Sequence, residues 1–134
     1  MHNIKTNRHS TYTLNYHFVV VTKYRHKVIN DDVFNLIREV LTNIIENKNK
    51  GSIISLNYEP DHIHAFVELP PQCCLSNVIN SFKTVSSRLV RKEFNEYISK
   101  FYWKPYFWSR AYFISTIGEV NFETIKNYIE NQKH

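Results

Sequence analysis

The chain has 134 residues, of which 43% are hydrophobic and 22% are charged, and its formal net charge at pH 7 is +5. This composition is typical of one folded domain covering residues 1–134 and excludes an intrinsically disordered chain. The basic balance favours a polyanionic partner such as nucleic acid.

The cellular setting is indicated by what the sequence lacks. The first residues have no apolar core of a signal peptide, and no apolar run reaches the roughly 18 residues that a membrane helix needs. The cysteines, Cys73 and Cys74, are adjacent, which suits neither a disulfide framework nor a zinc knuckle. We therefore expect a reduced protein of the cytoplasm, with no membrane partner and with this pair used in local packing.

The first half of the chain predicts a strand followed by a helix. Residues 13–25 are β-branched and aromatic, and their centre, residues 18–21, is apolar on both faces, which is typical of a central strand. Apolar side chains then recur at helical spacing across residues 30–48. Asn30 or Asp31 is suited to cap that helix.

The second half predicts further strands and helices. The Glu-Pro-Asp turn joins two strands, and Ser76 is suited to cap the helix that follows them. The expected elements are strands at 52–59 and 62–69, a helix at 75–98, an aromatic connector at 101–109, a strand at 110–118 and a helix at 119–134.

This order predicts an α+β fold of the ferredoxin or RRM-like type. Its βαββαβ unit forms a four-stranded antiparallel sheet with two helices on one face. The helix at 119–134 is additional to that unit. We expect it to cover the other face of the sheet or to dock on a partner chain.

Two histidines, His62 and His64, interrupt an otherwise apolar strand. Side chains two residues apart in a strand point to the same face, so both imidazoles should lie on the face without helices. Two imidazoles can bind one divalent metal ion but cannot complete its coordination. In the last predicted helix, Tyr128 and Gln132 are four residues apart and share one side. Taken singly, each of these residues has an ordinary structural explanation.

Taken together, these residues resemble the single-tyrosine HUH transposases of the 200/605 class of insertion sequences. The His-hydrophobe-His motif is His62-Ile63-His64, and the closing Tyr-x-x-x-Gln is Tyr128 to Gln132. Further resemblance lies in YHFVVVTKYRHKV (16–28), SFKTVSSRLVRKEF (81–94) and FWSRAYFISTIG (107–118). The matching blocks span nearly the whole chain in the family's order.

The resemblance implies an HUH nuclease fold whose C-terminal helix carries the nucleophile, Tyr128. It implies a metal site formed by His62, His64 and Gln132, with Mg²⁺ as the cofactor or Mn²⁺ in its place. It also implies a homodimer that cleaves and rejoins single-stranded DNA at insertion-sequence ends through a 5′-phosphotyrosine. The partner DNA would carry hairpins near those ends. For Asp61 we expect a structural role in the turn, holding an imidazole.

Two groups of basic residues are expected to contact DNA. Lys23, Tyr24 and Arg25 follow the first strand and combine positive charge with a ring. Lys83, Ser87, Arg88 and Arg91 form a polar side of the second helix. Trp103, Tyr106, Phe107 and Trp108 either stack bases or brace the core, and the core is favoured for Phe107.

Two other functions remain open at this point. A βαββαβ sheet with surface rings can be a non-catalytic module that binds single-stranded nucleic acid. A domesticated relative that processes palindromes would share the whole motif. The combination of His62, His64, Tyr128 and Gln132 argues against the binding module, which has no use for that set.

Overall fold

The protein is described by a computed structural model over residues 13–116, and it contains four strands and two long helices in that range. The strands are β1 (Leu14–Thr22), β2 (Ser52–Glu59), β3 (His62–Leu69) and β4 (Trp108–Thr116). The helices are α1 (Asp31–Thr42) and α2 (Leu75–Glu93), with the shorter α3 (Asn95–Ser99). A 3₁₀ turn, η1 (Lys23–Arg25), follows β1, and a wider π-helical segment, η2 (Asn43–Lys48), extends α1.

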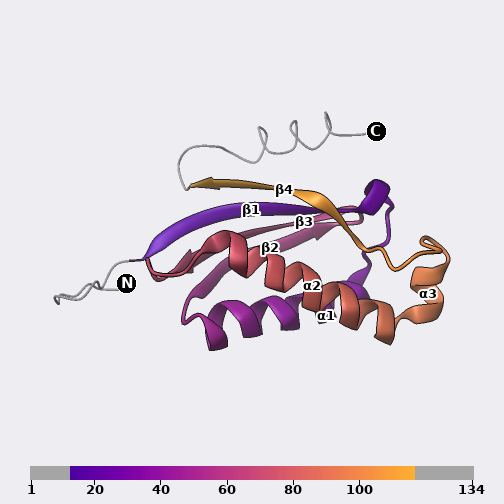
Figure 1. Ribbon diagram of the computed structural model, residues 1–134, viewed down its shortest axis with the longest axis horizontal. Coiled ribbons are helices and arrows are strands. Elements are labelled where there is room, and N and C mark those ends of the chain that lie inside the picture. The colour runs from indigo at the N-terminus through magenta and orange to yellow at the C-terminus, as the bar shows by residue number, and fades with distance from the viewer. Residues whose placement is uncertain (1–12, 117–134) are drawn as a thin grey trace.

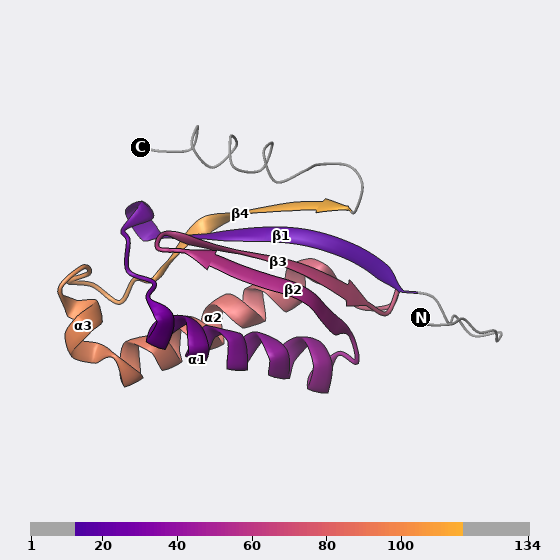
Figure 2. The same ribbon diagram turned by 180° about the vertical axis from the view of Figure 1, so that it is seen from behind.

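The strands form one antiparallel sheet in the order β2-β3-β1-β4, which confirms the predicted βαββαβ arrangement. β1 lies in the interior of the sheet, between β3 and β4, as its apolar centre predicts. α1 and α2 both pack on the same side of the sheet (Figure 1), and the reverse view shows the same two layers (Figure 2). The helix predicted at 119–134 lies outside the described residues.

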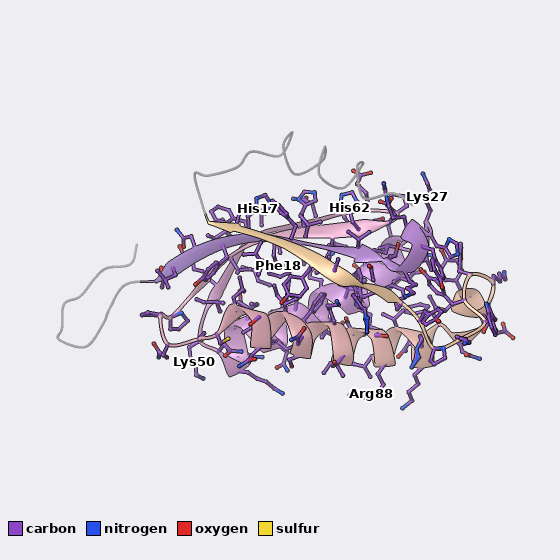
Figure 3. The ribbon with its side chains drawn as sticks, turned by 45° about the horizontal axis from the view of Figure 1, so that its top comes forward. His17, Phe18, Lys27, Lys50, His62 and Arg88 are labelled. Atoms are coloured by element: carbon purple, nitrogen blue, oxygen red, sulfur yellow. The ribbon has the colours of Figure 1, made fainter. Side chains whose placement is uncertain are left out.

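The core lies between the sheet and these two helices. Within that layer Phe18 and Val20 of β1 lie beside their paired residues of β3, Ala65 and Ile63. All four side chains are buried. Phe18 points from the sheet toward the helices in Figure 3. The alternate residue Val19 packs separately on the other face. The even-numbered positions of β3 therefore lie on the face that α1 and α2 leave uncovered.

Several predicted boundaries were wrong by a few residues. The strand predicted at 13–25 ends at Thr22, because the backbone turns into a left-handed conformation at Tyr24 and Arg25. The helix predicted at 75–98 is interrupted at Phe94, whose φ of −117° and ψ of 39° break the helical ladder. The strand predicted at 110–118 begins earlier, at Trp108.

Of the two predicted helix caps, the structure confirms the first and contradicts the second. Asn30 caps α1, since its side chain accepts a hydrogen bond from the Val33 amide at 2.8 Å. Ser76 does not cap α2: the cap position is Cys74, which makes no side-chain cap bond. The Ser76 hydroxyl instead lies 3.4 Å from the Cys74 sulfur.

Candidate active site

The histidine pair lies where the sequence predicts, on the sheet face opposite the two long helices. His62 and His64 are successive even positions of β3, and their ring centroids are 5.8 Å apart. His62 points away from the helix layer in Figure 3. Its side chain is only 8% exposed, whereas that of His64 is half-buried. The strand thus holds two imidazoles side by side with restricted freedom, as a ligand pair requires.

The turn before β3 orients the first imidazole. Oδ1 of Asp61 accepts a hydrogen bond from Nδ1 of His62 at 2.8 Å. A carboxylate can only accept here, so the proton lies on Nδ1 and the lone pair of the neutral ring lies on Nε2. Metal-binding histidines are commonly oriented by such a carboxylate. The contact agrees with the role expected for Asp61.

Asp61 is itself held by the end of β1. Arg25 donates from Nε and from a terminal nitrogen to Oδ2 of Asp61, at 3.0 and 2.7 Å. The Thr22 amide and hydroxyl donate to the Asp61 carbonyl, at 3.0 and 3.2 Å. Burial by itself would raise the pKa of Asp61, but the hydrogen bonds from His62 and Arg25 lower it to about 2. The carboxylate is therefore ionised at neutral pH.

This arrangement requires an unusual backbone. Tyr24 and Arg25 have φ values of 60° and 55°, although neither is glycine. Each such residue costs on the order of 1–3 kcal/mol, so the surrounding contacts must maintain it. The left-handed turn brings Arg25 back onto Asp61, and the Arg25 side chain is only 22% exposed. The structure thus places the predicted DNA-binding residue Arg25 on Asp61.

A third imidazole, which the sequence reasoning missed, lies on the same face. His17 of β1 pairs in register with Phe66, and its ring centroid is 6.1 Å from that of His64. Burial lowers the pKa of His17. Burial first, and then repulsion by the protonated forms of His62 and His17, lower the pKa of His64 to about 4. His64 is therefore neutral at pH 7, the form in which an imidazole can bind a metal ion.

The donors present fit a divalent metal ion. Two imidazoles, one of them oriented by a carboxylate, are suitable ligands for such an ion. Within residues 13–116 no group of three or more His, Cys, Asp or Glu side chains could hold a metal ion. A further ligand would thus have to come from another residue type or another part of the chain. Both Gln132, the predicted third ligand, and Tyr128, the predicted nucleophile, lie outside the described residues.

The residues predicted to contact DNA from the second helix differ in their exposure and contacts. Lys83 donates to the carbonyl of Arg110 at 2.9 Å and lies over the Tyr112 ring, so it packs against β4. Arg88 is exposed and points away from the sheet, on the opposite side of the molecule from His62 (Figure 3). Ser87 and Arg91 are half-buried.

The aromatic connector divides into core and surface residues. Phe107 and Trp108 are buried, which confirms the core prediction for Phe107. Trp108 donates from its ring nitrogen to the hydroxyl of Ser86, a fully buried residue of α2. Tyr106 is half-buried and contacts Lys23, while Trp103 is 84% exposed.

Comparisons with known proteins identify close relatives. The family model described as "Transposase IS200 like" matches residues 10–132. The ISDra2 transposase TnpA of Deinococcus radiodurans is 29% identical over 129 residues, covering 96% of this chain and 91% of that protein. The transposase for insertion sequence element IS200 of Salmonella typhimurium is 30% identical over 128 residues, covering 96% and 82%.

Solved structures share the fold. A crystal structure from Deinococcus radiodurans, described as that of a transposase, matches with a TM-score of 0.83 and 29% identity, covering 96% of this chain and 98% of that one. A REP-associated tyrosine transposase bound to a REP hairpin matches with a TM-score of 0.56 and 12% identity, covering 96% and 69%, and supports the fold alone. Among the described helices, none is both long and apolar enough to cross a membrane. The family match extends over nearly the whole chain, and the chain belongs to the IS200-like transposases.

Proposed function

We propose that this transposase cleaves and rejoins single-stranded insertion-sequence ends in a metal-dependent reaction, through a 5′-phosphotyrosine on Tyr128. The observation that carries the proposal is the oriented pair His62–His64, in which Asp61 holds His62 by a 2.8 Å hydrogen bond. A module that only binds nucleic acid needs no such pair. The family membership supports the same activity.

His62, His64 and Gln132 would hold the metal ion, Mg²⁺ or Mn²⁺. When bound, the ion would neutralise charge on the phosphate and orient it for attack. The two imidazoles carry no negative charge, so the bound ion would keep its full positive charge for the phosphate. Asp61 keeps Nδ1 of His62 engaged, so Nε2 would be the nitrogen that binds the ion.

In the covalent step we propose Tyr128 as the nucleophile. Its phenolic oxygen forms a bond to phosphorus while the bond from phosphorus to the 3′-oxygen of the preceding nucleotide breaks. The phenol loses its proton, and the departing 3′-oxygen gains one. The products are a 5′-phosphotyrosine and a free 3′-hydroxyl. Attack of such a hydroxyl on a phosphotyrosine reverses these changes and joins strands without ATP.

We propose two DNA-contacting regions on different sides of the molecule. The strand to be cleaved would pass over the uncovered sheet face at His62, in contact with Lys23 and Tyr24, while Arg25 stays bonded to Asp61. A subterminal hairpin would contact the basic residues of α2, which include the exposed Arg88. The REP-associated relative, described as bound to a REP hairpin, shares the fold and favours a hairpin partner.

The assembly we propose is a homodimer in the cytoplasm. Family resemblance supports this assembly, in which the helix that carries Tyr128 completes an active site of the same or the partner chain. Among residues 13–116 no group of three or more His, Cys, Asp or Glu side chains could hold a metal ion, which supports a contribution to the site from that helix. Size measurement in solution, with and without hairpin DNA, tests the dimer.

The central test is a denaturing gel for a covalent protein–DNA adduct. The protein is incubated with Mg²⁺ or Mn²⁺ and single strands taken from DNA flanking its own gene. Tyr128→Phe removes only the nucleophilic oxygen, and Tyr112→Phe removes a phenol hydroxyl from β4 as the matched control. We expect an adduct from the wild type and from Tyr112→Phe, and none from Tyr128→Phe.

The opposite outcomes are equally informative. Wild-type adduct levels in Tyr128→Phe would remove Tyr128 as the nucleophile. No adduct from the wild type, with hairpin binding intact, would favour a non-catalytic binding module. Excision of the element from a plasmid, measured alongside, separates a mobile-element enzyme from a domesticated palindrome-processing relative.

A further inference from the structure

We propose that an exposed aromatic surface at the end of β1 binds an unpaired base of the strand that enters the active site. This surface, the aromatic platform, consists of Lys23, Tyr24 and Tyr106. The inference rests on the proposed function and adds to it a contact with a base. Phosphate contacts alone would suffice for general DNA affinity.

The platform is built from two rings and one ammonium group. The rings of Tyr24 and Tyr106 meet edge to face, with centroids 5.9 Å apart. The Lys23 nitrogen lies over both rings, 5.3 Å from the Tyr24 centroid and 4.8 Å from that of Tyr106. Such an arrangement offers a ring face for a base and a cation for the adjoining phosphate.

Buried groups beneath the platform hold it in place. The Lys23 amide donates to the Phe107 carbonyl at 2.8 Å, and the Lys23 carbonyl accepts from the Tyr102 hydroxyl at 2.7 Å. Tyr102 is buried and contacts both Tyr106 and His26 through its ring. The rings are therefore presented by an ordered support, which lowers the entropic cost of binding a flexible strand.

The left-handed turn gives the platform its position. Its two residues direct their side chains differently: Arg25 contacts Asp61, whereas Tyr24 remains 64% exposed. Asp61 in turn contacts His62. The exposed ring is thus connected to the metal-ligating pair through two side-chain contacts. Strained backbone of this kind is concentrated at functional sites.

The chemistry of the surface favours single-stranded DNA over other partners. In a duplex the base faces are stacked on each other, and only an unpaired base can lie on a tyrosine ring. A protein partner of this basic chain would be acidic, and it would engage the lysine without needing the rings. The arrangement of rings with Lys23 above them suits a base with its phosphate.

The test measures binding of single strands that cannot form hairpins. The full chain carries Tyr128→Phe, so that no covalent adduct forms, and fluorescence anisotropy reports binding to a short labelled oligothymidylate. The same strand with abasic positions provides the matched ligand control. Tyr24→Ala removes the ring, Tyr24→Phe keeps it, and Trp103→Ala removes an exposed ring outside the platform.

We expect Tyr24→Ala to weaken binding about tenfold, within the range of base–aromatic stacking, and Tyr24→Phe to bind as the parent does. The abasic strand should bind the parent and Tyr24→Ala equally well. Lys23→Gln should reduce the salt dependence of binding by about 0.7 in the logarithmic slope, as expected for one phosphate contact. Thermal unfolding of each variant verifies that its fold is intact.

Unchanged oligothymidylate affinity in Tyr24→Ala would overturn the platform, as would an equal loss in Trp103→Ala. An equal loss for the abasic strand would also overturn it, because the ring would then act without a base. The proposed function can fail while the aromatic platform is supported. This would be the result if the wild type formed no adduct but still preferred strands with bases in a Tyr24-dependent way, as a non-catalytic binding protein would.

Discussion

The Asp61 carboxylate accepts a hydrogen bond from Nδ1 of His62 at 2.8 Å and receives two more from Arg25 on its other oxygen. One acidic side chain thereby connects the end of β1 to the first histidine of β3. The orientation of His62, the proposed metal ligand, depends on a residue 36 positions away from Asp61 in the sequence.

Asp61→Asn should weaken metal binding and cleavage, each by about 10- to 100-fold, because the amide no longer holds the Nδ1 proton as a carboxylate does. Mn²⁺ binding followed by electron paramagnetic resonance gives the affinity, and strand cleavage gives the rate. Glu59→Gln is the matched control: Glu59 pairs in register with His62 and is exposed, and it makes no described bond to that ring. Equal losses in the two variants would implicate general negative charge and exclude the specific bond.

Arg25→Gln should reduce Mn²⁺ affinity in the same direction and leave the salt dependence of DNA binding unchanged. The reason is that Arg25 is occupied by Asp61, so its loss releases the carboxylate and removes no phosphate contact. In the Asp61→Asn background the same change should add little, since the two residues act through one contact. A phosphate-binding arginine would instead lower the logarithmic salt slope by about 0.7 on single strands.

His64→Ala should abolish cleavage, or it should leave a low residual activity that no longer responds to Mg²⁺. His17→Ala is the matched control, because it removes a neighbouring imidazole of the same face, 6.1 Å from the His64 ring. We expect His17→Ala to retain Mn²⁺ binding. Titration of cleavage with Mg²⁺ compares the variants, and unchanged metal dependence in His64→Ala would contradict its assignment as a ligand.

The metal-free protein should lose stability as the pH falls from about 6.5 to about 4. The pKa of His64 is lowered from 6.5 to about 4 in the folded protein, mainly by burial, so the unfolded chain binds more protons in that interval. The contribution of a neutral His64 is complete above pH 6.5 and is lost as the pH falls through this window. Urea unfolding at pH 7 and pH 5, with a chelator present, measures it. His64→Gln should show a smaller loss of unfolding free energy between pH 7 and pH 5. An unchanged loss would show that His64 is not its source.

Ser86→Ala should destabilise the fold by about 1–3 kcal/mol, the cost of leaving a buried donor without a partner. The Ser86 hydroxyl accepts from the Trp108 ring nitrogen at 2.9 Å and donates to the Phe82 carbonyl at 2.6 Å. Ser87→Ala, at the half-buried neighbouring position, should change stability by less than about 0.5 kcal/mol.

A double-mutant cycle examines the same bond. Trp108→Phe removes the donor, so the cost of Ser86→Ala should become smaller in that background. Free energies of unfolding from urea titrations provide all four corners. Additive losses would show that the hydroxyl and the indole do not interact energetically.

The sequence around the Glu-Pro-Asp turn predicted the strands at 52–59 and 62–69 with the boundaries that the structure has. Their alternation is a local property, because successive side chains of a strand point to opposite faces. The same rule placed His62 and His64 together on one face. The ends of other elements were predicted less well. The helix breaks at Phe94, although no proline or glycine lies near that position in the sequence.

What the sequence by itself determined, then, is the order of strands and helices, the family, and the face on which the histidine pair lies. Only the tertiary structure decided that Arg25 holds Asp61, that His17 lies beside His64, and that Trp108 bonds to Ser86. These contacts join residues far apart in the chain. They depend on the pairing register of β1 with β3 and β4, and on a left-handed turn at two residues that are not glycine. No short-range pattern encodes either feature, because each is stabilised by the packing of the completed fold.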